Sequence, residues 1–292
     1  MSKPPKNLIL GLLMNMKLEM VRPFFLSLEK TGYAGDLCLF VNGLEPALRD
    51  FLRARRINLV PFQPAYLKPK YARLAGLARP FLKRGQWDRL EAQMALAYMH
   101  PHCARHVYYH AYLAECGADY GRVMLTDIRD VLFQRDPFDF ELSDGLGVFR
   151  EDTGRNIGAC RHSSTWIRHG FGPAVLAKLQ DKTSFCAGTI FGTPAAVSDY
   201  CARALQIFYA RKTRWTIDQA TFNYLLHLDP PPRMHEFNNE AGPVLTMSHM
   251  DADRFRFDAA GNLITPAGRV YNTLHQYDRH PGLVPQLLQH LT

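Results

Sequence analysis

Short apolar runs alternate with amphipathic stretches along the N-terminal part of the chain. The runs at 7–15, 36–43 and 57–62 have the length of strands that are buried on both faces. The stretches at 20–33 and 44–56 repeat their apolar residues with a helical period. Strands that alternate with helices form parallel sheets covered by helices on both sides, so the pattern predicts an α/β fold.

The same two patterns continue through the rest of the chain. We predict a long helix over roughly 88–117, with Pro101 as a candidate break, and a hairpin over 255–270. Residues 64–90 and the polar tail at 271–283 are expected to be irregular. The other predicted elements are strands at 122–126, 144–152, 184–194 and 242–248 and helices at 195–210 and 216–228. Together they predict one domain with a mostly parallel central sheet flanked by helices and a smaller antiparallel part in the C-terminal half.

Two acids stand where one of the buried strands is predicted to end. Asp127 follows the apolar run, and Asp130 comes three positions later. Ligands of open α/β sheets bind beyond the carboxyl ends of strands, and two neighbouring carboxylates repel each other unless a cation lies between them. Such oxygen ligands suit Mg²⁺ or Mn²⁺ shared with a phosphate, and Arg129 adds a planar donor for phosphate or carboxylate. The alternative is a turn whose acids pair with arginine for structural reasons only.

The segment "TDIRDVLFQRDPF" (126–138), with the helix and strand before it, resembles the GT-A fold glycosyltransferases that use nucleotide-diphospho-sugars. Their motif is a strand that ends in Asp-x-Asp; here two residues separate the acids, which leaves open which is the principal ligand. Segments resembling other parts of these enzymes are 185–193, 216–226 and 274–283. The resemblance implies a Rossmann-like GT-A domain over 1–292, in which 1–130 binds the nucleotide and 131–292 binds the acceptor and completes the metal site.

The resemblance also implies a metal site. Asp127 and Asp130 would hold Mn²⁺ or Mg²⁺ against the diphosphate of the donor, and His275 would return from the C-terminal segment as a third ligand. A neutral imidazole suits Mn²⁺ better than Mg²⁺. Asp278 or His249 could take the place of His275.

Five further residues are candidates for binding the nucleotide-sugar donor. A residue at the end of the first strand would contact the nucleoside, an arginine on the helix before the motif would contact the donor, and a glycine would let the backbone approach the sugar. Two more arginines would neutralise phosphate. These residues are Asn15, Arg105, Gly188, Arg129 and Arg279.

Asp218 and Gln219, at the start of a predicted helix, are the catalytic candidates. Thr216 is expected to be the N-cap of that helix. Asp218 could remove the acceptor's proton in an inverting transfer or stabilise a cationic sugar in a retaining one, and it could equally serve only the positive helix end. Gln219 would orient the sugar or the base.

The chain carries a formal net charge of +8, concentrated around 53–56 and 68–89. This charge suits a donor diphosphate, a lipid-linked acceptor or an anionic membrane surface, although a merely solubilising surface explains it as well. No nucleic-acid-binding motif is present. No apolar run approaches the roughly 20 residues that span a bilayer, and no signal peptide is recognisable, so we expect a cytoplasmic protein, with peripheral contact at the inner face of the membrane left open.

We therefore predict a metal-dependent glycosyltransferase that moves a sugar from a nucleoside-diphosphate-sugar to a hydroxyl of a glycan, glycolipid or growing polysaccharide. One alternative is a nucleotidyltransferase acting on a sugar phosphate, although the glycine-rich loop typical of those enzymes does not follow the first strand. The other is a non-catalytic protein of the same fold that binds nucleotide or glycan. P-loop and dinucleotide-binding motifs are absent.

Overall fold

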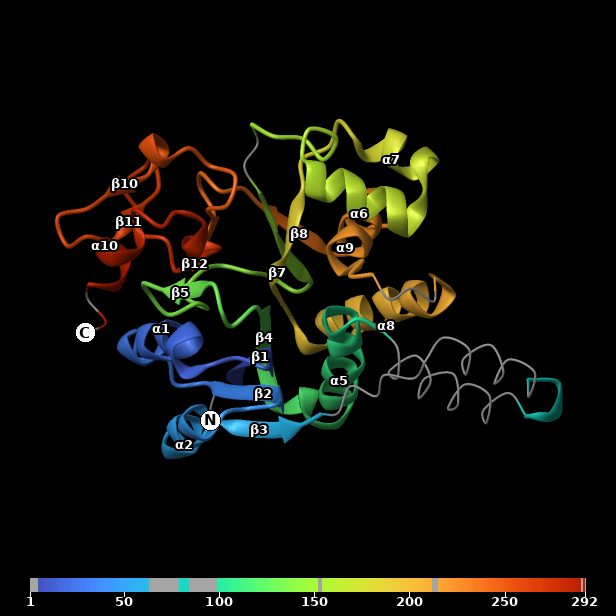
Figure 1. Ribbon diagram of the computed structural model, residues 1–292, viewed down its shortest axis with the longest axis horizontal. Coiled ribbons are helices and arrows are strands. Elements are labelled where there is room, and N and C mark those ends of the chain that lie inside the picture. Colours follow the sequence, from blue (N-terminus) through green and yellow to red (C-terminus); the bar gives the residue numbers. More distant parts are fainter. Residues whose placement is uncertain are drawn as a thin grey trace.

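A computed structural model describes residues 5–62, 79–83, 99–151, 154–211, 215–289 and 291. Its centre is a sheet of seven strands (Figure 1). In spatial order these are β3 (Asn58–Pro61), β2 (Asp36–Asn42), β1 (Lys6–Met14), β4 (Tyr120–Thr126), β7 (Phe185–Gly192), β6 (Leu146–Arg150) and β8 (Met234–Phe237).

Most neighbouring strands of the central sheet are parallel. The pairs β3/β2, β2/β1, β1/β4 and β6/β8 are parallel, whereas β7 runs antiparallel to β4 on one side and to β6 on the other. Consequently β6 runs in the same direction as β4, and the carboxyl ends of these two strands lie along the same side of the sheet. The predicted α/β class with a mostly parallel central sheet is confirmed.

Helices cover both faces of the sheet. In Figure 1, α1 (Leu18–Lys30) and α2 (Pro46–Ala54) lie on one side, and α5 (Pro101–Cys116) and α8 (Pro194–Arg211) lie on the other. Alternate residues of β1 serve the two layers: Leu10 packs in the core under α5 and α8, and Ile9 packs in the core under α1 and α2. This double burial explains why the strand reads as a continuous apolar run.

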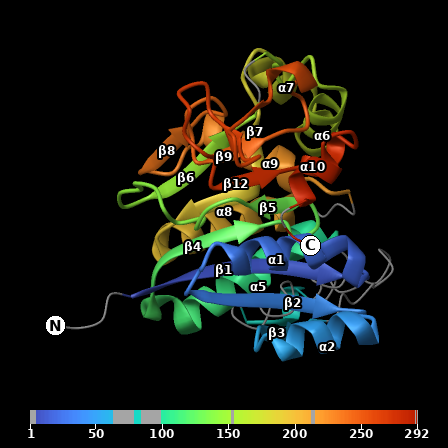
Figure 2. The same cartoon turned by 90° about the vertical axis from the view of Figure 1, so that its left-hand side faces the viewer.

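A second, smaller sheet lies beside the central one. It contains β5 (Val131–Phe133), β12 (Thr273–His275) and β9 (Val244–Thr246); β12 is antiparallel to β5 and parallel to β9. Figure 2 shows β5 next to α1, where the backbone N–H of Phe133 donates to the hydroxyl of Ser27. The expected hairpin is present as β10 (Arg256–Phe257) and β11 (Leu263–Ile264), and α10 (Val284–Leu288) follows near the C-terminus.

The described ranges contain three further α-helices, which form a group beside β7. They are α6 (Arg161–Phe171), α7 (Pro173–Leu179) and α9 (Asp218–Leu228), and α9 packs directly against β7. None of the helices in the described ranges is both long and apolar enough to cross a membrane.

One predicted element differs from the structure. The tail at 271–283 was expected to be irregular, yet it contains the buried strand β12, because β5 and β9 supply pairing partners on both of its sides. The candidate break at Pro101 is present: residues 99 and 100 are not helical and Pro101 begins α5, where a missing N–H costs no hydrogen bond, while residues 88–98 of the predicted helix lie outside the described residues. Most of the 64–90 segment lies outside the described residues, which include the short 3₁₀ turn Arg79–Phe81.

Candidate functional site

The loop between β4 and β5 is held in place by two other parts of the chain. The register of β4 against β7 pairs Thr126 with Thr189, so that the backbone N–H of Asp127 donates to the carbonyl of Gly188 at 2.9 Å. The register of β12 against β5 pairs His275 with Val131, directly after Asp130. The two aspartates and the histidine are therefore brought together by strand pairing.

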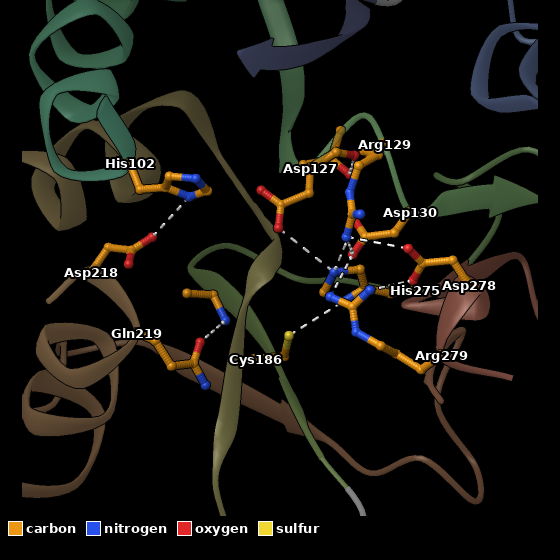
Figure 3. Close-up of polar contacts among 12 residues, drawn as sticks. His102, Asp127, Arg129, Asp130, Cys186, Asp218, Gln219, His275, Asp278 and Arg279 are labelled. Carbon is orange, nitrogen blue, oxygen red and sulfur yellow. Dashed lines mark hydrogen bonds and ion pairs between the residues drawn. The ribbon is translucent and has the colours of Figure 1, made fainter. Parts of the chain in front are cut away.

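The His275 ring lies between the two aspartates (Figure 3). Its Nε2 is 3.7 Å from Oδ2 of Asp127 and 3.9 Å from Oδ1 of Asp130, distances too long for hydrogen bonds. The side chain is 1% exposed, and Nε2 has no hydrogen-bond partner among the described residues. The other ring nitrogen, Nδ1, lies 3.2 Å from Sγ of Cys186. This buried nitrogen faces two carboxylates and has no hydrogen-bond partner in the portions of the chain that the structure describes, which is the arrangement expected of three ligands around a cation.

Gly188 leaves room for such a cation. A Cβ at this position would lie 2.3 Å from Cε1 and 2.5 Å from Nε2 of His275, and 2.7 Å from Oδ2 of Asp127. Any side chain would enter the space that these atoms face. One ligand atom from each of Asp127, Asp130 and His275 lies within 4.8 Å of the others. Two carboxylates and an imidazole form a donor set that suits Mn²⁺ and, less well, Mg²⁺.

The charges of the cluster are strongly coupled. Burial alone would raise the pKa of Asp127, but Arg105 and His275 outweigh it and hold this pKa below its usual range. Burial raises the pKa of Asp130, against the opposing charge of His275. Burial also opposes charge on His275, yet Cys186 and the two aspartates raise its pKa well above the ordinary value. A divalent cation at this place would take over the role of the imidazolium proton.

Arg105, from α5, joins the metal-binding candidates to the catalytic ones. Its Nη1 donates to Oδ1 of Asp127 at 2.7 Å, and its Nη2 donates to Oδ2 of Asp218 at 3.3 Å. The guanidinium is 7% exposed. A buried, always charged group that bridges two carboxylates fixes their orientation.

Asp218 is the first residue of α9, and its carboxylate contacts polar and charged side chains. The hydroxyl of Thr216 donates to its Oδ1 at 2.8 Å, and Nδ1 of His102 lies 3.7 Å from its Oδ2. Burial opposes ionisation, but Arg105 and His102 lower the pKa of the carboxyl. Thr216 was expected to cap the helix; the N-cap is Ile217, and the hydroxyl of Thr216 binds the side chain of Asp218 instead.

Gln219 fastens α9 to the edge of β7. Its Oε1 accepts from the backbone N–H of Ala187 at 2.8 Å, and its Nε2 donates to the carbonyl of Phe185 at 2.7 Å. The same Nε2 lies 3.3 Å from Oε1 of Glu151. The amide thus holds the backbone that leads directly to Gly188.

Two half-exposed arginines stand at the mouth of the cluster. Nη2 of Arg279 lies 3.5 Å and Nη2 of Arg129 lies 3.4 Å from Oδ2 of Asp130, and both guanidinium groups also contact Asp278. Their side chains are 41% and 39% exposed, whereas that of Asp130 is 8% exposed. The site therefore presents positive charge outward and negative charge inward.

Two adjoining hollows meet at this cluster. The larger, of about 460 Å³, is lined by Gly188, Asp218, Gln219 and His275 among others. The smaller, of about 380 Å³, is lined by residues that include Arg129 and Asp130. Both share Arg105, Asp127 and Arg279.

Asn15 is the one predicted site residue that the structure places apart from these hollows. It is exposed at the end of β1, where its backbone N–H donates to the carbonyl of Asn42 and its φ is 52°. Its neighbours Met14 and Met16 line the smaller hollow instead. All other residues of the predicted donor-binding, catalytic and metal sets line one hollow or both; Asp278, named only as an alternative to His275, lines neither and pairs with Arg129 and Arg279.

Three further polar residues of the larger hollow were not predicted as a group: Glu151, Cys160 and His249. Glu151 directly follows β6, which runs parallel to β4, so its place at the same edge as Asp127 could have been inferred from the topology. His249 was considered only as a substitute metal ligand, but it faces Glu151 at 4.0 Å and Cys160 at 3.7 Å. Nothing in the sequence spacing indicates that Cys160 joins them.

Comparison with known proteins gave a single kind of match. No protein-family model matches the chain, and no curated protein sequence does. Among solved structures, the chain is similar to the crystal structure of an active-site mutant of LgtC, with 15% sequence identity and a TM-score of 0.48 over 92% of this chain and 87% of that chain.

Proposed function

We propose that this protein is a metal-dependent glycosyltransferase, which moves a sugar from a nucleoside-diphosphate-sugar to a hydroxyl of a glycan, glycolipid or growing polysaccharide. The observation that carries the proposal is the cluster of Asp127, Asp130 and His275, whose Nε2 finds no hydrogen-bond partner in the described part of the chain. The cluster lies where the two hollows meet, beside two half-exposed arginines. A cation together with these arginines matches the charge of a diphosphate.

On the donor side, the protein's own residues bind and orient. Arg129 and Arg279 reach the mouth of the cluster and would turn from Asp130 and Asp278 toward the donor's phosphates. Arg105 is buried and holds Asp127 in place, so it is a positioning residue. The bound ion would stabilise the negative charge of the departing nucleoside diphosphate.

On the sugar side, Asp218 and Gln219 have different roles. Because the pKa of Asp218 is lowered, its carboxylate stays ionised and is a poor proton acceptor. It is better suited to stabilise positive charge that develops on the transferred sugar. Gln219 holds the backbone of β7 where Gly188 lets the sugar approach closely.

The larger hollow has room for the acceptor beyond Gln219. Its wall there includes Glu151, His249 and Trp166. An indole is a common platform for the apolar face of a sugar ring, and the polar groups can hydrogen-bond hydroxyls. We infer that a carbohydrate acceptor enters from this end.

Thermal-shift titration with UDP-, GDP-, CMP- and TDP-sugars, each with and without Mn²⁺, tests the proposal. We expect the sugars of one nucleotide class to stabilise the protein, and to do so only with Mn²⁺. When an acceptor is added, the protein should release free nucleoside diphosphate from that donor. Asp130→Asn should abolish the metal-dependent stabilisation, and Asp144→Asn, at an exposed ion pair with Arg233, should preserve it. Equal nucleotide binding with and without Mn²⁺ would contradict the proposal.

A further inference from the structure

Cys160 lies in the wall of the larger hollow, at the N-cap position of α6. Its Sγ is 3.7 Å from Nε2 of His249, a residue 89 positions away in the sequence. A thiol at the positive end of a helix and next to an imidazole is in the setting that favours the thiolate. The role proposed above for the metal cluster does not use either residue.

The surroundings of His249 favour its charged form. Oε2 of Glu151 lies 4.0 Å from Nε2, while Nη1 of Arg155 lies 3.5 Å from Nδ1 and acts in the opposite direction. The hydrogen bond with Cys160 has the largest effect on the pKa of His249 and raises it. Glu151 raises this pKa as well, and together the two outweigh burial and Arg155, which lower it. Both the thiol and the carboxylate face the same ring nitrogen, so this is an ion-pair arrangement and not a proton relay through the ring.

Cys160 differs from the other five cysteines, all of which lie in the described ranges. The hydrogen bond with His249 lowers the pKa of Cys160 to about 6, although burial raises it and Ser163 adds a smaller lowering effect. Burial raises the pKa of each of the others: Cys38, Cys103, Cys116, Cys186 and Cys201. Cys116 is the most exposed of these, so it makes an internal control for simple accessibility.

We propose that Cys160, paired with His249, is a nucleophilic thiolate site that takes small soft electrophiles from the cleft, such as alkyl halides and peroxides. With iodoacetamide, the sulfur lone pair forms the S–C bond while the C–I bond breaks and iodide leaves. With hydrogen peroxide, the sulfur forms an S–O bond to one oxygen while the O–O bond breaks. The departing hydroxide takes the proton of the imidazolium and leaves as water. The peroxide has then oxidised the thiolate to sulfenic acid.

The reactivity proposed for Cys160 does not depend on what the protein transfers. The effect of modifying Cys160 rests on the proposed function: if the larger hollow receives the acceptor, a group added to Cys160 would reduce the space in this hollow, which Trp166 and Glu151 also line. The labelling test below is carried out without nucleotide or metal, so its failure and the failure of the glycosyltransferase proposal are separate outcomes.

The test measures alkylation of the full-length protein by iodoacetamide from pH 5.5 to 9, with each cysteine peptide quantified by mass spectrometry. At pH 6.5 we expect Cys160 to react about tenfold faster than Cys116, because a low pKa raises the thiolate fraction more than it lowers nucleophilicity. The rate at Cys160 should level off above about pH 7, whereas the rate at Cys116 should keep rising. A rate at Cys160 below that at Cys116 at pH 6.5 would overturn the proposal.

His249→Gln identifies the cause. This variant should slow Cys160 by about tenfold at pH 6.5 and move the midpoint of its pH profile upward. His162→Gln, which changes another imidazole of the same hollow, should leave the profile unchanged. An unchanged profile in His249→Gln would refute the pairing, and if that variant does not fold, the pH profile of the unmodified chain still decides.

Discussion

The buried Arg105 and the partly exposed Asp127 form an ion pair of 2.7 Å that joins helix α5 to the end of strand β4. The same guanidinium reaches Asp218 at the start of α9, so the consecutive elements α5 and β4 meet the distant helix α9 at this one side chain. Asp127 belongs to the candidate metal cluster and Asp218 begins α9, and the fixed fork of the arginine holds both carboxylates at once. The geometry of the candidate site thus depends on a residue that would not itself touch the transferred group.

Replacing this arginine should destabilise the fold. Arg105→Met leaves the buried carboxylate of Asp218 and the partly exposed carboxylate of Asp127 without their cation, and we expect the free energy of unfolding to fall by about 3 kcal/mol. Urea denaturation at pH 7 measures the change. Arg135→Met, which breaks the exposed pair with Asp139, should cost less than about 0.5 kcal/mol. Similar losses of unfolding free energy in the two variants would show that the ion pairs of Arg105 stabilise the fold no more than an exposed ion pair does.

The lowered pKa of Asp218 predicts how its contribution depends on pH. A carboxyl whose pKa is lower in the folded state stabilises the protein above its unfolded value of about 3.9, and this stabilisation is lost as the pH falls toward the folded value. The difference in unfolding free energy between the unmodified chain and Asp218→Asn should therefore shrink from pH 6 to pH 3. Asp139→Asn, at an exposed site, is the control. A difference that grows on acidification would reverse the sign and reject the argument.

The left-handed turn at Asn15 allows a test of its predicted nucleoside contact. Glycine adopts a φ of 52° without strain, so Asn15→Gly should change the unfolding free energy by less than about 1 kcal/mol. Because the side chain is not among those that line the hollows, donor-induced stabilisation should be unchanged. Loss of that stabilisation in a folded variant would return Asn15 to the donor site.

The parts of the fold that could be predicted from sequence are those with a strong local pattern. The strands and helices up to Pro61 were predicted because β1 and β2 are buried on both faces, Leu59 and Val60 of β3 pack against the two cores, and each helix has one apolar face. The strand β12 was missed because Thr273 and His275 are polar and only Leu274 is apolar. Its conformation comes from partners at 131–133 and 244–246, which no local window contains.

The candidate site divides in the same way. Asp127 and Asp130 could be predicted because acids that follow a buried strand must lie at the carboxyl edge of the sheet. The proximity of His275 was expected only from a resemblance, and its physical cause is the register of β12 against β5. The pairing of Cys160 with His249 has no local pattern, since it arises where a helix start and a distant loop pack on the same hollow.

Gly188 provides the sharpest test of the proposed metal site, because an added methyl group would occupy the space that the three proposed ligands face. Its Cβ would meet His275 at 2.3 Å and Asp127 at 2.7 Å, so Gly188→Ala should weaken Mn²⁺ binding at least tenfold, a loss of about 1.4 kcal/mol. Titration of the protein with Mn²⁺ alone, followed by electron paramagnetic resonance of the free ion, measures the affinity. Gly282→Ala is the matched control, since a Cβ there meets no atom within 4 Å. Equal Mn²⁺ affinity in the two variants would place the ion elsewhere.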